Sequence, residues 1–282
     1  MWHGNGKGNL VDETKCTACR ACQVACKQWN QNSGVKTVNR GSYENPPTLG
    51  SETFMRIMFN EQYKNGAMNW FFTKDQCMHC NDAACVNVCP PNATVHEELK
   101  LQDGTVLKRV VTDADKCIGC NYCRVACPFD VPGYDQQDKG IKRCTLCFDR
   151  VTNDKPGFNI PACVKVCAPG TLSFGNRDEL IAKGEARVAE LQKAGYPDAR
   201  LYGKDELKGL HYLYVFTNQP SDYGMPNNPS VPIGVTVWKA LTKPYGAISV
   251  IGLAAALVVN AVINARNRGL EEKYGLDEEG RE

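Results

Sequence analysis

The sequence predicts an α+β fold made of two small cysteine-rich units with long loops, followed by one C-terminal transmembrane helix. Three observations lead to this prediction. The 16 cysteines fall into four groups of four, the spacing of one group recurs in another, and residues 245–265 contain no charged side chain. Repeated cysteine spacing predicts repeated metal-binding loops, and a long uncharged stretch predicts a helix in a hydrocarbon environment.

The most regular cysteine group lies in the middle of the chain, from Cys117 to Pro128. Its spacing is C-x2-C-x2-C-x3-C-P, and its thiols are Cys117, Cys120, Cys123 and Cys127. This is the ferredoxin run for a 4Fe-4S cluster, in which the fourth cysteine ligates the neighbouring cluster. The two predicted units are therefore ferredoxin-like, and each holds two clusters by exchanging fourth cysteines.

Three further groups contain all the remaining cysteines. One repeats the central spacing, one has a gap of four residues and is followed by proline, and the last has a long insertion between its second and third members. They are Cys16, Cys19, Cys22 and Cys26; Cys77, Cys80, Cys85 and Cys89; and Cys144, Cys147, Cys163 and Cys167. Because no thiol is left over, the sequence predicts that all of them bind iron-sulfur clusters.

Three other roles for the cysteines are weaker interpretations. Structural zinc uses two C-x2-C pairs per metal and does not need a run of four. Disulfides would make adjacent thiols compete for partners in strained loops. The third alternative is clusters that only brace the fold and carry no electrons.

The charge balance gives no reason to propose nucleic acid or another polyanion as a partner. Lysine and arginine together number 33 and aspartate and glutamate 31, which gives a net charge of +2. The first residues, Met1 to Gly6, have neither the basic nor the apolar segment of a secretion signal. We therefore expect the metals to be loaded in a reducing compartment, whatever the final location of the chain.

Local patterns predict short elements around the first two cysteine groups. A short helix should begin near Val24 and Ala25, and residues 31–50, rich in Asn, Gly, Ser and Pro, should form a surface insertion. Thr53–Phe59 and Asn69–Thr73 contain β-branched and aromatic residues and are expected strands.

Three further elements are predicted beyond the second group. Residues 99–112 should form a hairpin that turns at Asp103–Gly104. A helix is expected over Asn176–Ala194, since Asn176 is a suitable N-cap and Gly195 follows the end. His211–Thr217 is an expected strand.

The C-terminal region is expected to differ from the rest. Residues 219–243 are rich in proline and should form a stiff extended linker rather than a core element. Residues 244–266 should form a transmembrane helix, because the uncharged stretch is long enough to cross a hydrocarbon core of roughly 30 Å. A buried helix of a soluble protein is the alternative. Residues 267–282 form a polar tail.

Two features of the predicted span suggest a partner and an orientation. Small residues and amides recur every four residues, as in transmembrane helices that pack against a neighbour: Gly252, Ala256, Asn260 and Asn264. Basic residues are slightly more frequent after the span than before it, which favours a cytoplasmic C-terminus. The cluster-binding part would then lie on the periplasmic side.

No pattern predicts that the chain catalyses a reaction by itself. His3, His79, His96 and His211 have no metal spacing, and there is no nucleophile triad, phosphate loop or dinucleotide fingerprint. His79, between Cys77 and Cys80, is either a loop residue or a donor that tunes a cluster. Seven basic residues near the cysteine runs are either solvated surface or charges that raise cluster potentials: Lys15, Arg20, Lys27, Lys116, Arg124, Lys142 and Arg143.

Cysteine spacing alone does not decide whether neighbouring or nested groups pair. The chain as a whole resembles the four-cluster iron-sulfur subunits of molybdopterin oxidoreductases, most of all the beta subunit of respiratory formate dehydrogenase. The order of the groups and four stretches carry the resemblance: residues 16–30 with Cys-Gln-Val-Ala-Cys-Lys-Gln-Trp-Asn, residues 117–128, residues 142–147, and the tail Val235–Lys239. The resemblance covers residues 8–268.

The resemblance implies a nested pairing and four 4Fe-4S clusters. Group one would exchange its fourth cysteine with group four, and group two with group three. The four ligand sets, numbered as sets one to four, would be Cys16, Cys19, Cys22 and Cys167; Cys26, Cys144, Cys147 and Cys163; Cys77, Cys80, Cys85 and Cys127; and Cys89, Cys117, Cys120 and Cys123. Residues 1–75 and 140–218 would then form the first ferredoxin-like unit and residues 76–139 the second.

The resemblance also implies a function as an electron relay. Electrons from formate would pass from a catalytic alpha subunit, holding molybdenum or tungsten on bis-molybdopterin guanine dinucleotide, through this chain to a gamma subunit with haem b, a membrane cytochrome b, and then to quinone. The chain would be anchored in the lipid bilayer of the inner membrane. The alternatives are the same relay in a polysulfide, tetrathionate, nitrate or dimethyl sulfoxide enzyme or a hydrogenase, and a scaffold braced by clusters.

Overall fold

The computed structural model describes residues 6–64, 66–153, 155, 157–239, 257–263 and 265. The chain divides into two compact units, Met1–Pro232 and Ile233–Glu282. All sixteen cysteines belong to the first unit. Its fold is a mixture of helices and small sheets, as the α+β prediction required.

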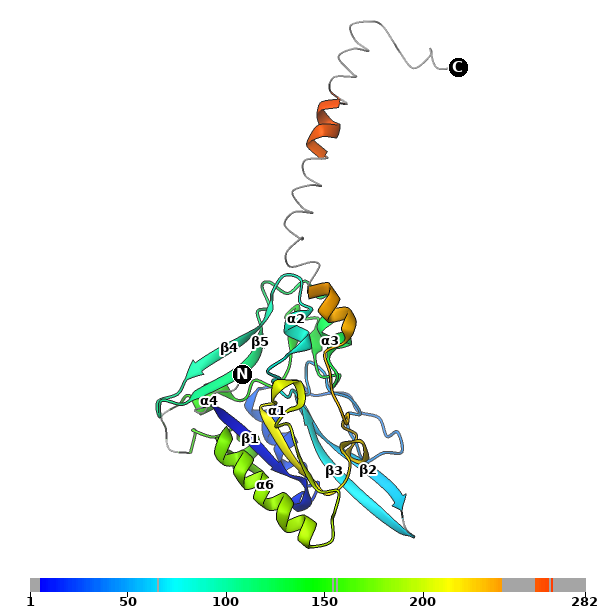
Figure 1. Ribbon diagram of the computed structural model, residues 1–282. Coiled ribbons are helices and arrows are strands. Elements are labelled where there is room, and N and C mark those ends of the chain that lie inside the picture. Colours follow the sequence, from blue (N-terminus) through cyan, green and yellow to red (C-terminus); the bar gives the residue numbers. More distant parts are fainter. Residues whose placement is uncertain are drawn as a thin grey trace, which may run out of the picture. The chain divides into compact units, whose positions relative to one another are not determined.

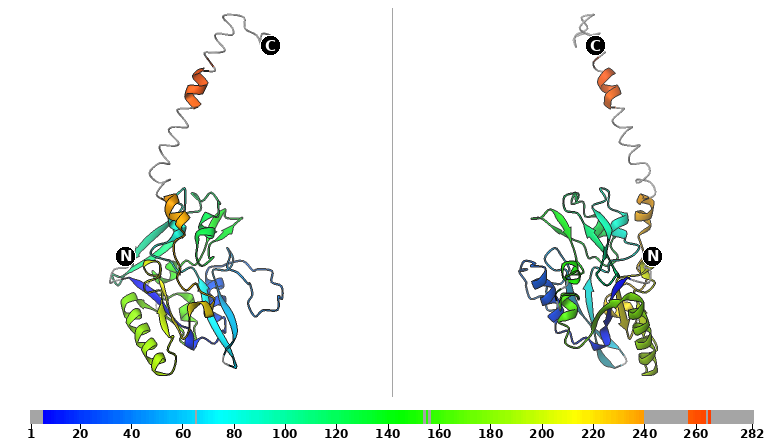
Figure 2. Two further views of the ribbon diagram at one scale, coloured as in Figure 1. Left: turned by 45° about the vertical axis from the view of Figure 1, so that its right-hand side comes forward. Right: turned by 90° about the vertical axis from the view of Figure 1, so that its left-hand side faces the viewer.

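The largest sheet has four strands and joins segments from both ends of the first unit. Its order is β8 (Leu172–Asn176), β1 (Lys7–Asp12), β10 (Tyr212–Phe216) and β9 (Arg200–Tyr202). The central strand β1 pairs antiparallel with β8, where Asn9 faces Phe174, and parallel with β10, where it faces Tyr212. Figures 1 and 2 show the N-terminal strand β1 lying among the later strands.

The two faces of this sheet have different neighbours. Helix α6 (Arg177–Lys193) covers one face, where its Leu180 and Leu191 pack with Leu213 and Val215 (Figure 1). The alternate residues of β10, Tyr212, Tyr214 and Phe216, belong to the core that contains the cysteine loops. This division follows from the two-residue period of a strand. The sheet therefore holds the cysteine loops on the face opposite α6.

A strand leads into each cysteine group. Strand β1 precedes Cys16. The hairpin of β2 (Met55–Lys64) and β3 (Ala67–Gln76) ends next to Cys77, and that of β4 (Thr94–Lys100) and β5 (Val106–Thr112) precedes Cys117. The short pair β6 (Gly133–Asp135) and β7 (Gly140–Lys142) precedes Cys144. The sheets thus fix where each loop starts.

A short helix carries the third cysteine of each group. These helices are α1 (Ala21–Trp29), α2 (Ala84–Asn87), α3 (Tyr122–Ala126) and α5 (Ala162–Lys165), while α4 (Phe148–Val151) follows Cys147 directly. Three 3-10 turns, Glu13–Lys15, Glu206–Lys208 and Pro220–Tyr223, complete the regular elements described for this unit. Every group therefore has the same order of strand, loop and helix.

Most of the predicted elements are present. The strands near 53–59 and 69–73 are confirmed as β2 and β3, the hairpin near Asp103–Gly104 as β4 and β5, and the strand near 211–217 as β10. The long helix is confirmed as α6, and the Asn176 side chain accepts a hydrogen bond from the Asp178 backbone N–H, as expected of an N-cap. Residues 31–50 are mostly exposed and have no regular element, as predicted.

The prediction of an extended linker was wrong for the first residues of the proline-rich segment. Residues 220–223 form a 3-10 turn, and Tyr223 and Met225 are buried in the core. Tyr223 packs 4.8 Å from Phe71 and 4.3 Å from Phe216, measured between ring centroids. Prolines suggested an extended spacer, but these two large apolar side chains gain more by burial than by exposure.

The predicted transmembrane helix, residues 244–266, lies largely outside the described residues. Residues 257–263 and 265, which fall within it, are helical. Among the residues that the structure describes, none belongs to a helix long and apolar enough to cross a membrane. The predicted polar tail, 267–282, also lies outside the described residues.

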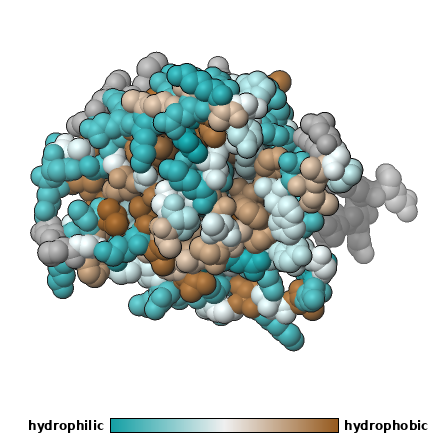
Figure 3. Space-filling model, turned by 90° about the horizontal axis from the view of Figure 1, so that it is seen from below, coloured by the Kyte–Doolittle hydropathy of each residue, from teal (hydrophilic) through white to brown (hydrophobic). Residues whose placement is uncertain are grey.

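Apolar side chains are exposed at several places on the first unit. Figure 3 shows apolar side chains gathered toward the middle of the lower face. Tyr63 and Met68, on the β2–β3 hairpin, are 72% and 54% exposed, and Ile118 and Val125, beside the third cysteine group, are 66% and 85% exposed. Exposed apolar side chains that form a contiguous patch often mark a site of contact with another protein.

Candidate metal centres

All four cysteine groups begin with the same backbone turn. The residue two positions after the first cysteine has a left-handed conformation in each group, with φ of 51° at Ala18, 46° at His79, 69° at Gly119 and 55° at Leu146. Only one of the four is glycine, so three residues adopt a backbone conformation that L-residues rarely take. The shared turn indicates that the four loops are built to one pattern.

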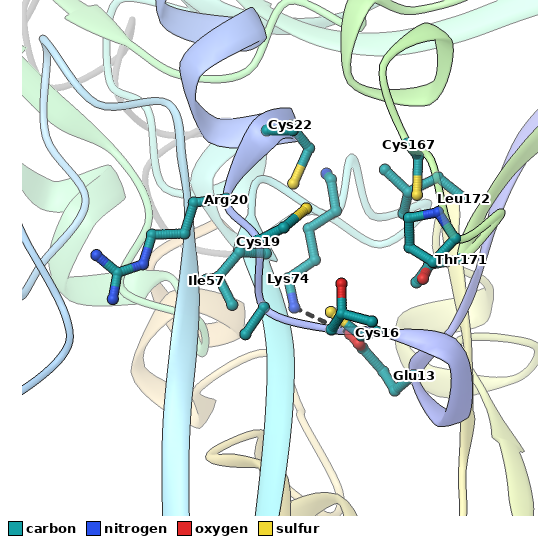
Figure 4. Close-up of a pocket in the computed structure, with 14 residues that line it drawn as sticks. Glu13, Cys16, Cys19, Arg20, Cys22, Ile57, Lys74, Cys167, Thr171 and Leu172 are labelled. Carbon is teal, nitrogen blue, oxygen red and sulfur yellow. Dashed lines mark hydrogen bonds between the residues drawn. The ribbon is translucent and has the colours of Figure 1, made fainter.

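The first cavity collects thiols from both ends of the sequence. Cys16, Cys19, Cys22 and Cys167 line one pocket, and their sulfurs point into it (Figure 4). The first three come from the loop after β1 and the start of α1, and Cys167 follows α5. These are the four cysteines of predicted set one.

Helix α1 directs two thiols of one group to different places. Cys22 and Cys26 are separated by about one helical turn, which advances the chain by about 5.4 Å. Cys22 lines the first cavity, whereas Cys26 is buried and does not. This step along a helix is the physical reason why one group can serve two neighbouring sites.

The thiol of Cys26 lies among the cysteines of group four. Burial raises its pKa well above the ordinary value, and the charges of three thiolates raise it further, those of Cys144, Cys163 and Cys147. Near them, the Asn30 side-chain amide nitrogen is 3.6 Å from the Cys26 sulfur, and the Tyr212 hydroxyl oxygen is 3.7 Å from the Cys144 sulfur. The structure thus brings the members of predicted set two together.

The remaining thiols gather in two more places. Burial raises the pKa of Cys80 well above its usual range, and so do the charges of Cys77, Cys85 and Cys127, the other members of predicted set three. Burial raises the pKa of Cys123 to about 11; Arg143 opposes this, and Cys85, Cys120 and Cys89 add to it. Cys120 and Cys89 belong to set four, whose last member, Cys117, begins the same loop.

Neighbouring sets approach one another in order. Cys163 of set two is close enough to Cys22 of set one for its charge to raise the pKa of Cys22, which burial and the remaining causes bring to about 12. Cys144 of set two acts in the same way on the buried Cys77 of set three. Cys85 of set three acts on Cys123 of set four, so the charges of successive sets act on one another in the order one to four.

The donors and their surroundings fit iron-sulfur clusters. Burial raises the pKa of Cys16 and of Cys147 to about 12, so these thiols remain protonated at neutral pH unless a cation replaces the proton. In the described part of the chain, no three side chains of Cys, His, Asp or Glu converge on one point closely enough to bind a single metal ion. A 4Fe-4S cluster needs no such point, because each of its four thiolates binds a different iron.

His79 is a buried residue of the second cysteine loop. It is 2% exposed, and its Nδ1 accepts a hydrogen bond of 2.9 Å from the Val110 backbone N–H. The proton of the neutral ring is therefore on Nε2. Burial holds the pKa of His79 well below its usual range, so the ring is neutral.

The sequence analysis missed Glu13 and Lys74, which both line the first cavity. Each is buried, with 5% and 2% of its surface exposed, and the Lys74 backbone N–H donates a 2.9 Å hydrogen bond to Glu13 Oε1 (Figure 4). Of the seven basic residues noted near the cysteine runs, only Arg143 is buried. A lysine at the end of an apolar strand and a glutamate before a cysteine run were the available signals.

Comparison with known proteins gives the class of the domain first. A family model described as a 4Fe-4S dicluster domain matches residues 68–177, which contain the last three cysteine groups. The middle of the chain is therefore similar to a 4Fe-4S dicluster domain.

Longer relatives then give the family. The chain is 36% identical to the formate dehydrogenase-O iron-sulfur subunit of Escherichia coli, over 96% of this chain and 87% of that protein. It is 37% identical to the formate dehydrogenase iron-sulfur subunit of Haemophilus influenzae, over 89% and 78% of the two chains. It is also 37% identical to formate dehydrogenase subunit beta of Megalodesulfovibrio gigas, over 77% and 96%. The chain belongs to the family of formate dehydrogenase iron-sulfur subunits.

Proposed function

We propose that this chain is the electron-transfer subunit of a formate dehydrogenase, and that it holds four 4Fe-4S clusters in a row. A 4Fe-4S cluster accepts and donates one electron at a time. The observation that carries the proposal is the gathering of thiols from distant groups around separate sites, of which the cavity of Cys16, Cys19, Cys22 and Cys167 is the clearest. The similarity to named formate dehydrogenase subunits supports formate as the electron source.

The ligand sets are those of the nested pairing. Groups one and four, in residues 1–75 and 140–218, would form one two-cluster unit, and groups two and three, in residues 76–139, the other. The position of Cys167 beside Cys16, and of Cys26 beside Cys144, supports this pairing over one between neighbouring groups. The charge interactions between successive sets support the order one, two, three, four.

The role of this chain's residues is to hold the sites and to limit access to them. Most cysteines are buried or partly buried, whereas Cys19 of set one and Cys120 of set four are exposed. The exposed thiols therefore belong to the two ends of the row. Electrons would enter and leave there, with the exposed Ile118 and Val125 beside set four available to a partner subunit.

The partners follow from the same reasoning. The chain by itself would be non-catalytic, and a molybdopterin alpha subunit with molybdenum or tungsten would oxidise formate. A cytochrome b gamma subunit would pass the electrons to quinone. Residues 244–266 would anchor the chain in the inner membrane by a single span, with the cysteine-rich unit on the periplasmic side.

The test is to purify the chain anaerobically with whatever holds it and to record low-temperature EPR spectra before and after adding formate. We expect formate to produce the signals of reduced 4Fe-4S clusters, and the co-purifying haem subunit to become reduced in turn. Reduction by dithionite but not by formate would overturn the assignment to formate dehydrogenase. Protease added to spheroplasts should cut the cysteine-rich unit, and protection there would overturn the periplasmic location.

A further inference from the structure

Lys74 is a buried cation between two thiol sites. Its side chain extends from β3 toward the sulfurs of Cys22 and Cys167 (Figure 4). Its ammonium nitrogen donates a 2.8 Å hydrogen bond to Gln76 Oε1 and lies 4.4 Å from the centroid of the Tyr212 ring. Within the part of the chain that the structure describes, the ammonium group makes no ion pair with a carboxylate. A lysine this deeply buried requires some other negative charge.

The negative charge that faces Lys74 is that of thiolates from two ligand sets. Lys74 lines the cavity of Cys22, and the Tyr212 ring, 4.4 Å from its ammonium nitrogen, carries a hydroxyl oxygen that lies 3.7 Å from the Cys144 sulfur. Burial lowers the pKa of Lys74, but the nearby thiolate charges raise it by more: Cys163, Cys144, Cys22 and Cys26. Cys22 belongs to set one and the other three to set two. Lys74 therefore lies at the boundary of these two sites and is close to both.

Arg143 has the corresponding position between the other two sites. It is 6% exposed, its Nη1 lies 3.3 Å from the Cys85 sulfur, and its Nη2 donates a 2.8 Å hydrogen bond to Thr112 Oγ1. Thr112 Oγ1 is in turn 3.0 Å from Thr94 Oγ1, and the Thr94 backbone N–H donates a 3.4 Å hydrogen bond to the Cys89 sulfur. Cys85 belongs to set three and Cys89 to set four, so each pair of sites has one buried cation at its boundary.

We propose that the positive charges of Lys74 and Arg143 raise the reduction potentials of the two cluster pairs, one cation for each pair. The proposal rests on the proposed function, since it requires clusters at the four thiol sites. A cluster with four thiolate ligands is negatively charged and becomes more so on reduction. A positive charge held nearby in a medium of low dielectric constant therefore stabilises the reduced form more than the oxidised form.

Burial separates these two residues from the other basic residues near the cysteines. Lys116, next to Cys117, has a side chain that is 64% exposed and paired with Asp113 at 2.8 Å. Water and salt screen such a charge, so its effect on a cluster is small. Lys74 and Arg143 are not exposed to that screening.

The experiment is an anaerobic redox titration of the full complex, followed by EPR, for Lys74→Met and Arg143→Met. Each variant should lower the midpoint potentials of two of the four clusters, and the two variants should affect different pairs. We expect the equilibrium constant for one-electron reduction to fall roughly tenfold or more, which corresponds to about 59 mV for a one-electron couple. Unchanged potentials in a variant with normal iron content would overturn the proposal for that residue.

Three further variants separate charge from structure. Lys74→Arg and Arg143→Lys keep the positive charge. Their midpoint potentials should therefore differ from those of the original protein by less than half of the shift seen in the matching methionine variant. Lys116→Met removes an exposed charge and should have little effect. If Lys74→Met loses iron, Lys74→Gln, which can still bond Gln76, takes its place in the titration. Shifts in Lys116→Met as large as those at the buried sites would count against a role for burial.

The unaltered complex separates the two proposals. If it has no 4Fe-4S signals, the proposed function is wrong. If it has four reducible clusters whose potentials do not respond to Lys74 or Arg143, only the assignment of these two cations is wrong.

Discussion

The guanidinium Nε of Arg150 donates a 2.7 Å hydrogen bond to the carbonyl oxygen of Ile160. The two residues lie on opposite arms of the insertion that separates Cys147 from Cys163. Arg150 also donates from Nη2 to the Gly157 carbonyl at 2.6 Å, and its guanidinium lies 4.8 Å from the Trp29 ring centroid and 4.7 Å from that of Phe158. One buried side chain therefore holds the insertion closed and sets the separation of two thiols of one set.

Replacing Arg150 should loosen that site. Arg150→Met removes both hydrogen bonds and leaves two carbonyl groups unpaired, which should lower the free energy of unfolding by about 2 kcal/mol. Iron should also be lost faster to a chelator. The urea midpoint and the iron remaining after a fixed time measure the two effects. Arg40→Met, an exposed arginine on the 31–50 insertion, is the control, and equal losses in both variants would contradict the role of Arg150.

Double substitutions of cysteine should reveal which thiols share a cluster. Cys26→Ala with Cys147→Ala removes two ligands of one cluster, so we expect a loss of about four irons per chain. Cys26→Ala with Cys22→Ala removes ligands of two clusters, so the loss should be about eight. Iron analysis of the purified complexes distinguishes the two cases. If the first double variant lost about eight irons and the second about four, the four cysteines of one group would bind one cluster, and the nested scheme would be wrong.

Gly203 should not tolerate a side chain. Its φ is +97°, and an added Cβ would lie 2.4 Å from the Tyr212 carbonyl oxygen, which belongs to the backbone of β10 and cannot move alone. Gly203→Ala should therefore cost roughly 2–4 kcal/mol of stability. At Gly184 in α6 the added Cβ would meet the flexible end of Leu201 at 2.7 Å. Thermal unfolding should show a clearly smaller loss for Gly184→Ala, and equal losses would contradict this reasoning.

The protein should become less stable as the pH falls below 6.5 because of His211. This residue is fully buried in the folded protein, and burial, followed by the charges of Arg177 and Lys74, lowers its pKa to about 3. The unfolded chain therefore binds a proton that the folded chain does not, and the stability present above pH 6.5 is lost as pH falls toward 3. The slope from this group approaches about 1.4 kcal/mol per pH unit.

His211→Gln removes this titration and keeps a polar side chain. Urea midpoints between pH 5 and 7.5, with cluster absorbance recorded in the same samples, should vary less with pH in the variant than in the original protein. The same pH dependence in both proteins would exclude His211 as the source.

The sequence predicted the parts of this protein that depend on local patterns. The cap at Asn176, the turn at Asp103–Gly104 and the aromatic strand at 212–216 each have a signal within a few residues, and each is present. Cysteine spacing likewise indicated four metal-binding loops. These features need no knowledge of what the rest of the chain does.

Features that depend on contacts between distant segments could not be predicted in this way. Nothing local shows that Lys74, at the end of a hydrophobic strand, faces thiols from groups one and four. The left-handed turns at Ala18 and Leu146 were also invisible, because neither residue is glycine or asparagine. Tyr223 was assigned to a linker because its neighbours are prolines, although its ring fills a space beside Phe71 and Phe216.

The sharing of one cavity by Cys16 and Cys167 has a consequence for biosynthesis. The ribosome makes the first thiol long before the last, so the site cannot be completed while the intervening chain is still being made. Groups two and three, which lie between them, are finished earlier. A nascent chain stopped before Cys167 should therefore be able to take up iron in its middle section and not at its N-terminal loop, which makes the order of cluster insertion a property of the chain's topology.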